Sequence, residues 1–119
     1  MRTTTKENPE YCAVESAMEV LGGRWKLAIL KTLVPGTLRF GEIRRALPAI
    51  TQRMLTRQLR ELEADGLVTR TVYREVPPRV EYTLTDAGQR LDAIMDQLDT
   101  WGRWYQETVH RPESAADAP

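Results

Sequence analysis

The segment from residue 51 to residue 65 has the clearest periodic pattern of apolar and polar positions in the chain. Its apolar residues recur at intervals of four and three positions, at Leu55, Leu59 and Leu62. Three arginines fall on the opposite side of a helix with that period: Arg53, Arg57 and Arg60. Thr51 suits the N-cap, and Gly66 suits the left-handed position that ends a helix. We therefore predict an amphipathic helix whose basic face is either solvated or used to bind an anion.

Two helices are predicted near the start of the chain. Residues 14–21 carry one apolar stripe and end at a pair of glycines, which favours a helix terminus. Residues 25–33 are apolar on most sides and are followed by Pro35 and Gly36, which stop a helix. We interpret this second helix as the central element of the core.

A third helix is predicted at residues 41–47, directly before the basic helix. Phe40, Ile43 and Leu47 share one face of it, and its arginines do not. Only Pro48, Ala49 and Ile50 separate it from the next helix, which is the connection length of a helix-turn-helix. The segment Leu38-Arg39-Phe40 is too short to assign alone.

After Gly66 the apolar period changes from 3.6 to 2. Residues 68–73 and 80–84 alternate between two faces, as half-buried antiparallel strands do. The connection between them holds two prolines and has Arg74 and Arg79 at its ends. A basic hairpin directly after a helix-turn-helix indicates a wing, and the alternative is an ordinary loop with two solvated arginines.

A long helix is predicted from Asp86 to Thr108. Its apolar residues follow a 4-3 spacing over nearly three heptads: Ala87, Leu91, Ile94, Leu98, Trp101 and Tyr105. At 1.5 Å per residue this helix would be roughly 35 Å long, more than so small a domain covers by itself. We expect dimerisation through this helix; the alternative is that it folds back over its own core.

Length and charge change this picture in one respect. The chain has 119 residues with 17 basic and 17 acidic side chains. Residues 39–60 nevertheless carry six arginines against Glu42 alone, so a polyanion would meet a positive local field.

Only one cysteine and one histidine are present, which excludes an internal disulfide and makes a metal site or other cofactor unexpected. Without a long apolar run or signal peptide, we expect a cytoplasmic protein.

Three segments of the chain resemble the HxlR family of bacterial transcription regulators, which are MarR-like winged-helix proteins. They are CAVESAMEVLGGRWKLAILKTL, LRFGEIRRALPAITQRMLTRQLRELEADGLVTR and EVPPRVEYTLTDAGQRL. The resemblance covers roughly residues 11–105 and departs from the family pattern at Ala13, where proline is common, and at Thr51, where serine is common. It implies a mainly α-helical fold with a small β-hairpin, a winged helix-turn-helix with a long C-terminal dimerisation helix.

The expected organisation has four parts: a flexible arm at residues 1–10, a DNA-binding domain at 11–85, a dimerisation helix at 86–111 and a disordered tail at 112–119. In a homodimer on a palindromic operator, the leading end of the recognition helix would read bases, with Thr51, Gln52, Arg53, Thr56 and Arg57 as candidates. The candidates for contacts to the DNA backbone are Arg39, Arg44, Arg45 and Arg60, with Arg74 and Arg79 anchoring the wing. The expected dimer interface consists of Leu91, Ile94, Leu98, Trp101 and Tyr105.

Cys12 is expected at the start of the first helix, where the helix dipole favours a thiolate but Glu10 and Glu15 oppose it. The residues alone leave a structural role and a reactive role open. The family resemblance adds the hypothesis that Cys12 senses oxidants or electrophiles.

Two other classes of function have less support in the sequence. An enzyme has little support, because no nucleophile has a visible base and no glycine-rich phosphate loop is present. A winged helix used only for protein contact would bind DNA without sequence preference and with weak dependence on salt. We therefore predict a sequence-specific regulator that acts as a repressor, with an inducer that the sequence does not name.

Overall fold

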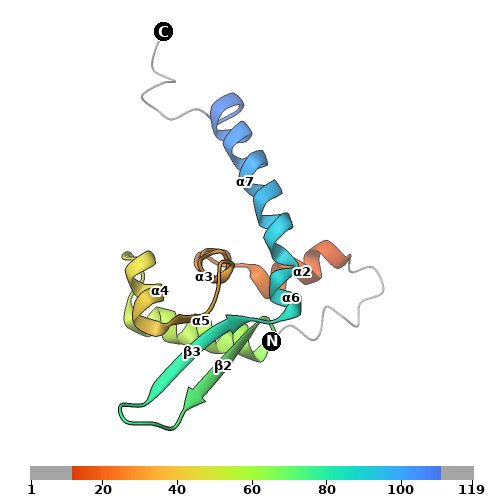
Figure 1. The fold of residues 1–119 in the computed structure, drawn as a ribbon. Helices are drawn as coiled ribbons and strands as arrows, with labels where there is room; N and C mark the ends of the chain where they lie inside the picture. The colour runs from red at the N-terminus through yellow and green to blue at the C-terminus, as the bar shows by residue number, and fades with distance from the viewer. Residues whose placement is uncertain (1–11, 111–119) are drawn as a thin grey trace. The chain divides into compact units, whose positions relative to one another are not determined.

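The computed structural model describes residues 12–110, which form the helices and strands drawn in Figure 1. The expected arm at 1–10 and the expected tail at 112–119 lie outside the described residues. The chain divides after Gln89 into two compact units. The first holds the helix-turn-helix and the sheet, and the second holds the long C-terminal helix.

Helices α2 (Ala13–Leu21) and α3 (Lys26–Leu33) confirm the two helices predicted near the start of the chain. Gly23 follows the end of α2 with φ of 98°, the left-handed conformation that favours glycine there. Helix α3 is central to the core, because Ile29 and Leu30 are fully buried.

Helices α4 (Phe40–Ala46) and α5 (Gln52–Ala64) form the predicted helix-turn-helix. The hydroxyl of Thr51 accepts a hydrogen bond from the backbone N–H of Met54 at 3.0 Å, which satisfies one free donor at the start of α5. Gly66 has φ of 81° just past its end. The three leucines of α5 are at most 1% exposed, as the periodicity predicts.

A three-stranded antiparallel sheet completes this unit, in the order β1-β3-β2. Strands β2 (Val68–Tyr73) and β3 (Arg79–Leu84) are the predicted hairpin, which projects away from the helices in Figure 1. Strand β1 (Leu38–Arg39) is the short segment that sequence periodicity could not assign. It exists because β3 offers it a free edge, with Leu38 opposite Tyr82. The predicted winged helix-turn-helix fold is therefore confirmed.

The single helix predicted from Asp86 is interrupted at Arg90, giving α6 (Asp86–Gln89) and α7 (Leu91–Thr108). The short helix belongs to the first unit and is held to the rest of it through Thr85, whose hydroxyl donates to the Gly66 carbonyl at 2.6 Å and accepts from the Gly88 N–H at 3.1 Å. A Cβ atom at Gly88 would lie only 2.4 Å from the Leu67 carbonyl oxygen, so glycine permits this close approach. In residues 12–110, none of the helices is both long enough and apolar enough to span a membrane.

Candidate nucleic-acid interface

Helix α5 presents one continuous polar surface opposite its buried leucines. Gln52, Arg53, Arg57 and Arg60 are exposed and Thr56 is half-buried. Together with Glu61 these five residues line one open hollow along the helix. The arginine fork can bond phosphate oxygens or the acceptor edge of guanine, and Gln can bond adenine. Thr51, at the head of this surface, is exposed, but its hydroxyl already caps the helix.

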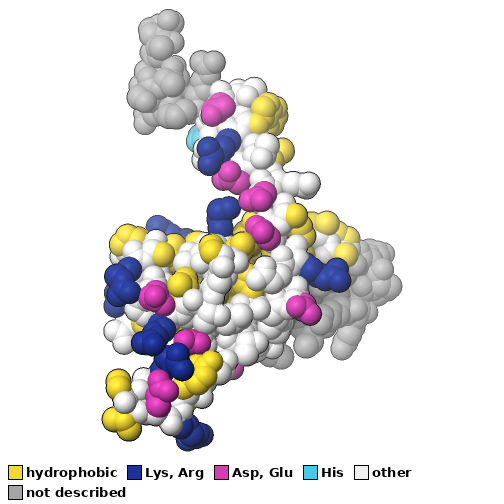
Figure 2. Space-filling model, in the orientation of Figure 1, with side chains coloured by type: hydrophobic (Ala, Val, Ile, Leu, Met, Phe, Trp, Pro, Cys, Tyr) yellow, Lys and Arg dark blue, Asp and Glu magenta, His cyan; other side chains and the backbone are white. Residues whose placement is uncertain are grey.

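Helix α4 adds a second group of basic side chains next to the leading end of α5. Arg44 and Arg45 line a hollow that also includes Gln52. Arg39, the N-cap residue of α4, is exposed, and its backbone N–H donates to the Glu42 carboxylate at 2.8 Å. In Figure 2 the Lys and Arg side chains gather on the part of the first unit that carries α4 and the hairpin. The fold thus joins the predicted basic residues of α4 and α5 into one positive surface.

Arg70 belongs to the same surface, although sequence reasoning did not select it. It lies opposite Tyr82 in the sheet and is exposed. With Arg60 and Phe40 it lines a third hollow of about 330 Å³ between α5 and the sheet. The alternation of β2 could have placed Arg70 on one sheet face, but only the packed sheet brings it beside Arg60.

The two arginines of the hairpin have different environments. Arg74 is exposed near the tip. Arg79 lies in β3, where its guanidinium is 3.2 Å from Glu75, 3.2 Å from Glu81 and 3.9 Å from the ring centroid of Tyr73. Arg79 therefore holds the shape of the hairpin in the free protein, whereas Arg74 is available for a ligand.

A charge pair between buried Lys26 and partly exposed Glu61 adjoins the α5 surface and was not predicted from the sequence. The side chain of Lys26 is 7% exposed and donates a hydrogen bond to the Glu61 carboxylate. The other Glu61 oxygen is 3.5 Å from Nε of Arg57. The hydrogen bond from Lys26 lowers the pKa of Glu61 and Arg57 acts in the same direction, although partial burial of the carboxyl opposes both.

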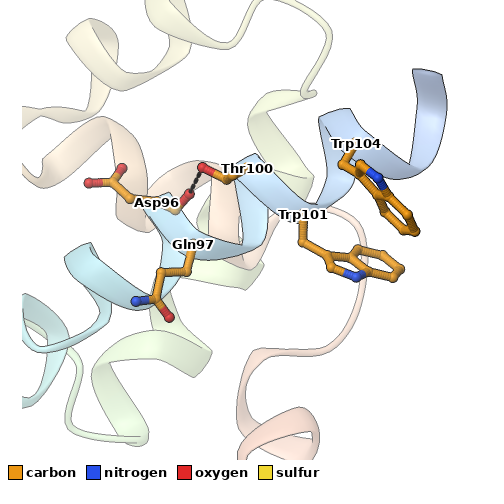
Figure 3. A pocket seen from close by; sticks show the side chains of 5 residues that line it. All are labelled: Asp96, Gln97, Thr100, Trp101 and Trp104. Carbon is orange, nitrogen blue, oxygen red and sulfur yellow. Dashed lines mark hydrogen bonds between the residues drawn. The ribbon is translucent and has the colours of Figure 1, made fainter. Parts of the chain in front are cut away.

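Helix α7, in the second unit, carries an apolar seam defined by Leu91, Ile94, Leu98, Trp101 and Tyr105. Ile94 and Leu98 are each 50% exposed and Trp101 is 58% exposed. Trp101 stacks on Tyr105 with ring centroids 5.3 Å apart, and Figure 3 shows Trp101 and Trp104 extending outward from the same end of the helix. Such a row of half-exposed large apolar side chains is typical of a protein–protein contact surface.

Cys12 is the N-cap residue of α2, as expected, and its thiol is exposed and free. Its backbone N–H donates to the Glu15 carboxylate at 3.2 Å. Cys12 is thus accessible to small reactive molecules.

Within residues 12–110, no cluster of three or more His, Cys, Asp or Glu side chains is arranged to hold a metal ion.

Comparison with known proteins agrees with this geometry. Residues 20–110 match the HxlR-like helix-turn-helix family. A protein of Methanothermobacter thermautotrophicus named as an HTH-type transcriptional regulator is 54% identical over 111 residues, which covers 92% of this chain and 83% of that protein.

Two solved structures are informative. The redox regulator HypR in its oxidized form is 53% identical with a TM-score of 0.72, over 77% of this chain and 95% of that chain. The quinone-bound YodB from Bacillus subtilis is 38% identical with a TM-score of 0.66, over 76% of this chain and 94% of that chain.

The Lys26–Glu61 pair predicts a specific loss of stability in acid. Because the folded-state pKa of Glu61 is lowered from its ordinary 4.5, the stabilisation is complete above that value and is lost as the pH falls below it. Glu61→Gln should lower the free energy of unfolding by about 1–2 kcal/mol at neutral pH, a modest value because solvent screens the partly exposed carboxylate. The difference between variant and wild type should shrink towards pH 3, which urea unfolding at several pH values would measure.

The matched control is Glu63→Gln on the same helix. Glu63 is exposed and has no ion pair with another residue of the described part of the chain. This variant should unfold like wild type at neutral pH. An equal destabilisation by Glu61→Gln in neutral and acidic solution would show that the charge pair does not contribute.

Proposed function

The chain belongs to the HxlR-like helix-turn-helix family of transcriptional regulators, and we propose that it binds a palindromic DNA operator as a homodimer and represses transcription in the cytoplasm. The observation that carries this proposal is the surface of α5. One hollow there, beside the arginines of α4, is lined by four base-reading candidates and one backbone candidate: Gln52, Arg53, Thr56 and Arg57, with Arg60. A helix with such a surface fits the major groove of DNA.

In this proposal the leading end of α5 reads base edges. The reading residues are Thr51, Gln52, Arg53, Thr56 and Arg57. Since Thr51 also caps the helix, its contribution is to fix where the helix starts and to place Gln52 and Arg53 at the base edges. The arginine and glutamine side chains supply the choice of sequence.

The remaining arginines contact the DNA backbone and supply affinity without sequence choice. From the sequence these are Arg39, Arg44, Arg45, Arg60, Arg74 and Arg79, and the third hollow adds Arg70. Arg79 would have to exchange its contacts with Glu75 and Glu81 for a phosphate, so Arg74 is the stronger anchor of the wing. These contacts set the steepness of the salt dependence.

The apolar seam of α7 supports the homodimer. Its 4-3 spacing and half-exposed side chains suit the same seam of a second copy. A two-fold dimer places two recognition helices on half-sites about one helical turn of DNA apart. That geometry is the reason to expect a palindromic operator.

Cys12 is proposed as the sensing residue, because structures similar to this chain are those of a redox regulator and a quinone-bound regulator. An exposed thiol can add to the ring of a quinone. The sulfur electron pair forms a C–S bond and the thiol proton moves to one ring oxygen. The hydrogen on the attacked ring carbon then moves as a proton to the other ring oxygen, so the product is a hydroquinone thioether and no further oxidant is needed. An adduct at the N-cap would disturb the start of α2, where Cys12 and Glu15 are hydrogen-bonded.

The alternative function is a winged-helix module for protein contact that does not bind DNA specifically. The clustering of exposed arginines around α5 favours DNA, because a polyanion gains most from such a surface. A protein-contact module would show weak salt dependence and no preferred DNA sequence.

Arg57→Ala should weaken binding to the preferred DNA by more than about threefold, because it removes a base-reading guanidinium. Arg44→Ala should mainly reduce the slope of log Kd against log salt concentration by about one, because it removes a phosphate contact. The preferred DNA would be selected from a random pool, and binding measured by mobility shift at several salt concentrations. If Arg57→Ala bound the preferred DNA as tightly as wild type, Arg57 would not be a base-reading residue. If the wild-type protein selected no sequence from the pool, the proposed function would be contradicted.

Leu98→Asp should convert the protein to monomers, because a carboxylate in the seam of α7 would be buried without a partner. Light scattering after size exclusion would measure the mass. The control is Gln106→Asp, which adds the same charge at an exposed position off the 4-3 spacing of the seam. A Leu98→Asp protein that remains dimeric would move the interface elsewhere.

Treatment with benzoquinone should add one quinone per chain at Cys12 and lower the affinity for the operator. Mass spectrometry of the intact protein and a mobility shift before and after treatment would measure both effects. Cys12→Ser should bind the operator normally and keep that affinity after treatment. An equal loss of binding in Cys12→Ser would show that the thiol is not the sensor.

A further inference from the structure

Lys26 is the one buried charged residue in the described part of the chain, 6% exposed. It is the first residue of α3, the central helix of the core. The first turn of α3 contains no acidic residue, so the positive end of this helix and the ammonium group of Lys26 lie together without a local counter-charge. A buried ammonium in this position requires an anion from elsewhere in the fold.

Glu61 of α5 supplies that anion from 35 positions further along the chain. One of its carboxylate oxygens accepts from Lys26, and the other lies 3.5 Å from Nε of Arg57. The side chain of Lys26 is 7% exposed, that of Glu61 35% and that of Arg57 69%. The three side chains therefore form a chain of charges that runs from the core to the DNA-facing surface of α5.

We propose that Lys26 is a positioning residue for DNA reading, an inference that rests on the proposed function. By holding one oxygen of Glu61 from the interior, Lys26 leaves a single oxygen to orient the guanidinium of Arg57. The Nη groups of Arg57 then remain available for a base edge, while Nε faces Glu61. Ordering a long side chain before binding reduces the entropy lost on binding.

Without Lys26, the Glu61 carboxylate could turn and engage Arg57 with both oxygens. A bidentate pair would occupy the same donors that Arg57 offers to guanine. The loss would therefore affect the preferred sequence more than DNA in general, because contacts of the other arginines to phosphates do not pass through Glu61. A purely structural Lys26 would instead weaken binding to all DNA as the folded fraction falls.

The test is a double-mutant cycle between Lys26→Met and Arg57→Ala. Methionine has a length similar to lysine and suits a buried site. The readout is the ratio of affinities for the selected operator and for a scrambled duplex of the same length at one salt concentration. We expect each single variant to lower this ratio by about fivefold or more, and the double variant to lower it no further than Arg57→Ala alone.

Lys31→Met is the matched control, since Lys31 lies on the same helix and is exposed. It should leave the ratio unchanged. The proposal would be overturned if the reductions of the affinity ratio by Lys26→Met and by Arg57→Ala multiplied in the double variant. Lys26 would then act independently of Arg57. An unchanged ratio in Lys26→Met would overturn it as well.

If Lys26→Met does not fold, Glu61→Gln takes its place in the cycle, because it keeps the size of the side chain and removes the charge that links Lys26 to Arg57. In this variant no carboxylate remains to sequester Arg57, so the ratio should fall only because the ordering of Arg57 is lost. The double variant should again lower the ratio no further than Arg57→Ala alone, and multiplicative effects would again contradict the proposal. The affinity ratio of the wild-type protein separates this proposal from the proposed function. A wild-type ratio near one would contradict specific DNA binding itself. A high wild-type ratio, with the effects of the two single variants multiplying in the double variant, would contradict only the role of Lys26.

Discussion

The burial of three leucines on one side of α5 is the constraint on which the rest of the surface depends. Leu55, Leu59 and Leu62 are at most 1% exposed, so the helix can be turned in only one way about its axis. That orientation places its arginines in solvent, beside those of α4. The cap at Thr51 and the left-handed Gly66 fix where the helix begins and ends. Core packing thereby determines which side chains α5 presents to solvent.

Electrostatics in this protein is local. The 17 basic and 17 acidic side chains cancel over the chain, yet the surface around α4 and α5 is strongly positive. Its arginines are not equivalent: Arg74 is exposed near the tip of the hairpin, whereas Arg79 is held within the hairpin by Glu75 and Glu81. Charge counts alone would have given all of them the same role. The three-dimensional arrangement separates the exposed arginines from one that is held within the hairpin.

The second unit presents the opposite situation, because its most informative residues are apolar and half-exposed. The seam of α7 has the spacing of a coiled coil, and its two aromatic residues, Trp101 and Tyr105, stack on one another along the helix. In the proposed homodimer, this seam would join two recognition helices and give DNA binding a two-fold geometry. The proposed function therefore combines two surfaces of different chemistry, one basic and one apolar.

The sequence alone determined the helices, the hairpin, the caps at Thr51 and Gly66 and the basic face of α5, because periodicity and capping involve residues within about four positions of one another. Only the tertiary structure determined the contacts between segments that are far apart in the chain. It formed β1 on the edge of β3, brought Arg70 beside Arg60, broke the last helix at Arg90 and buried Lys26 against Glu61. These depend on contacts between residues far apart in the chain, and a pattern of neighbouring residues contains no record of them.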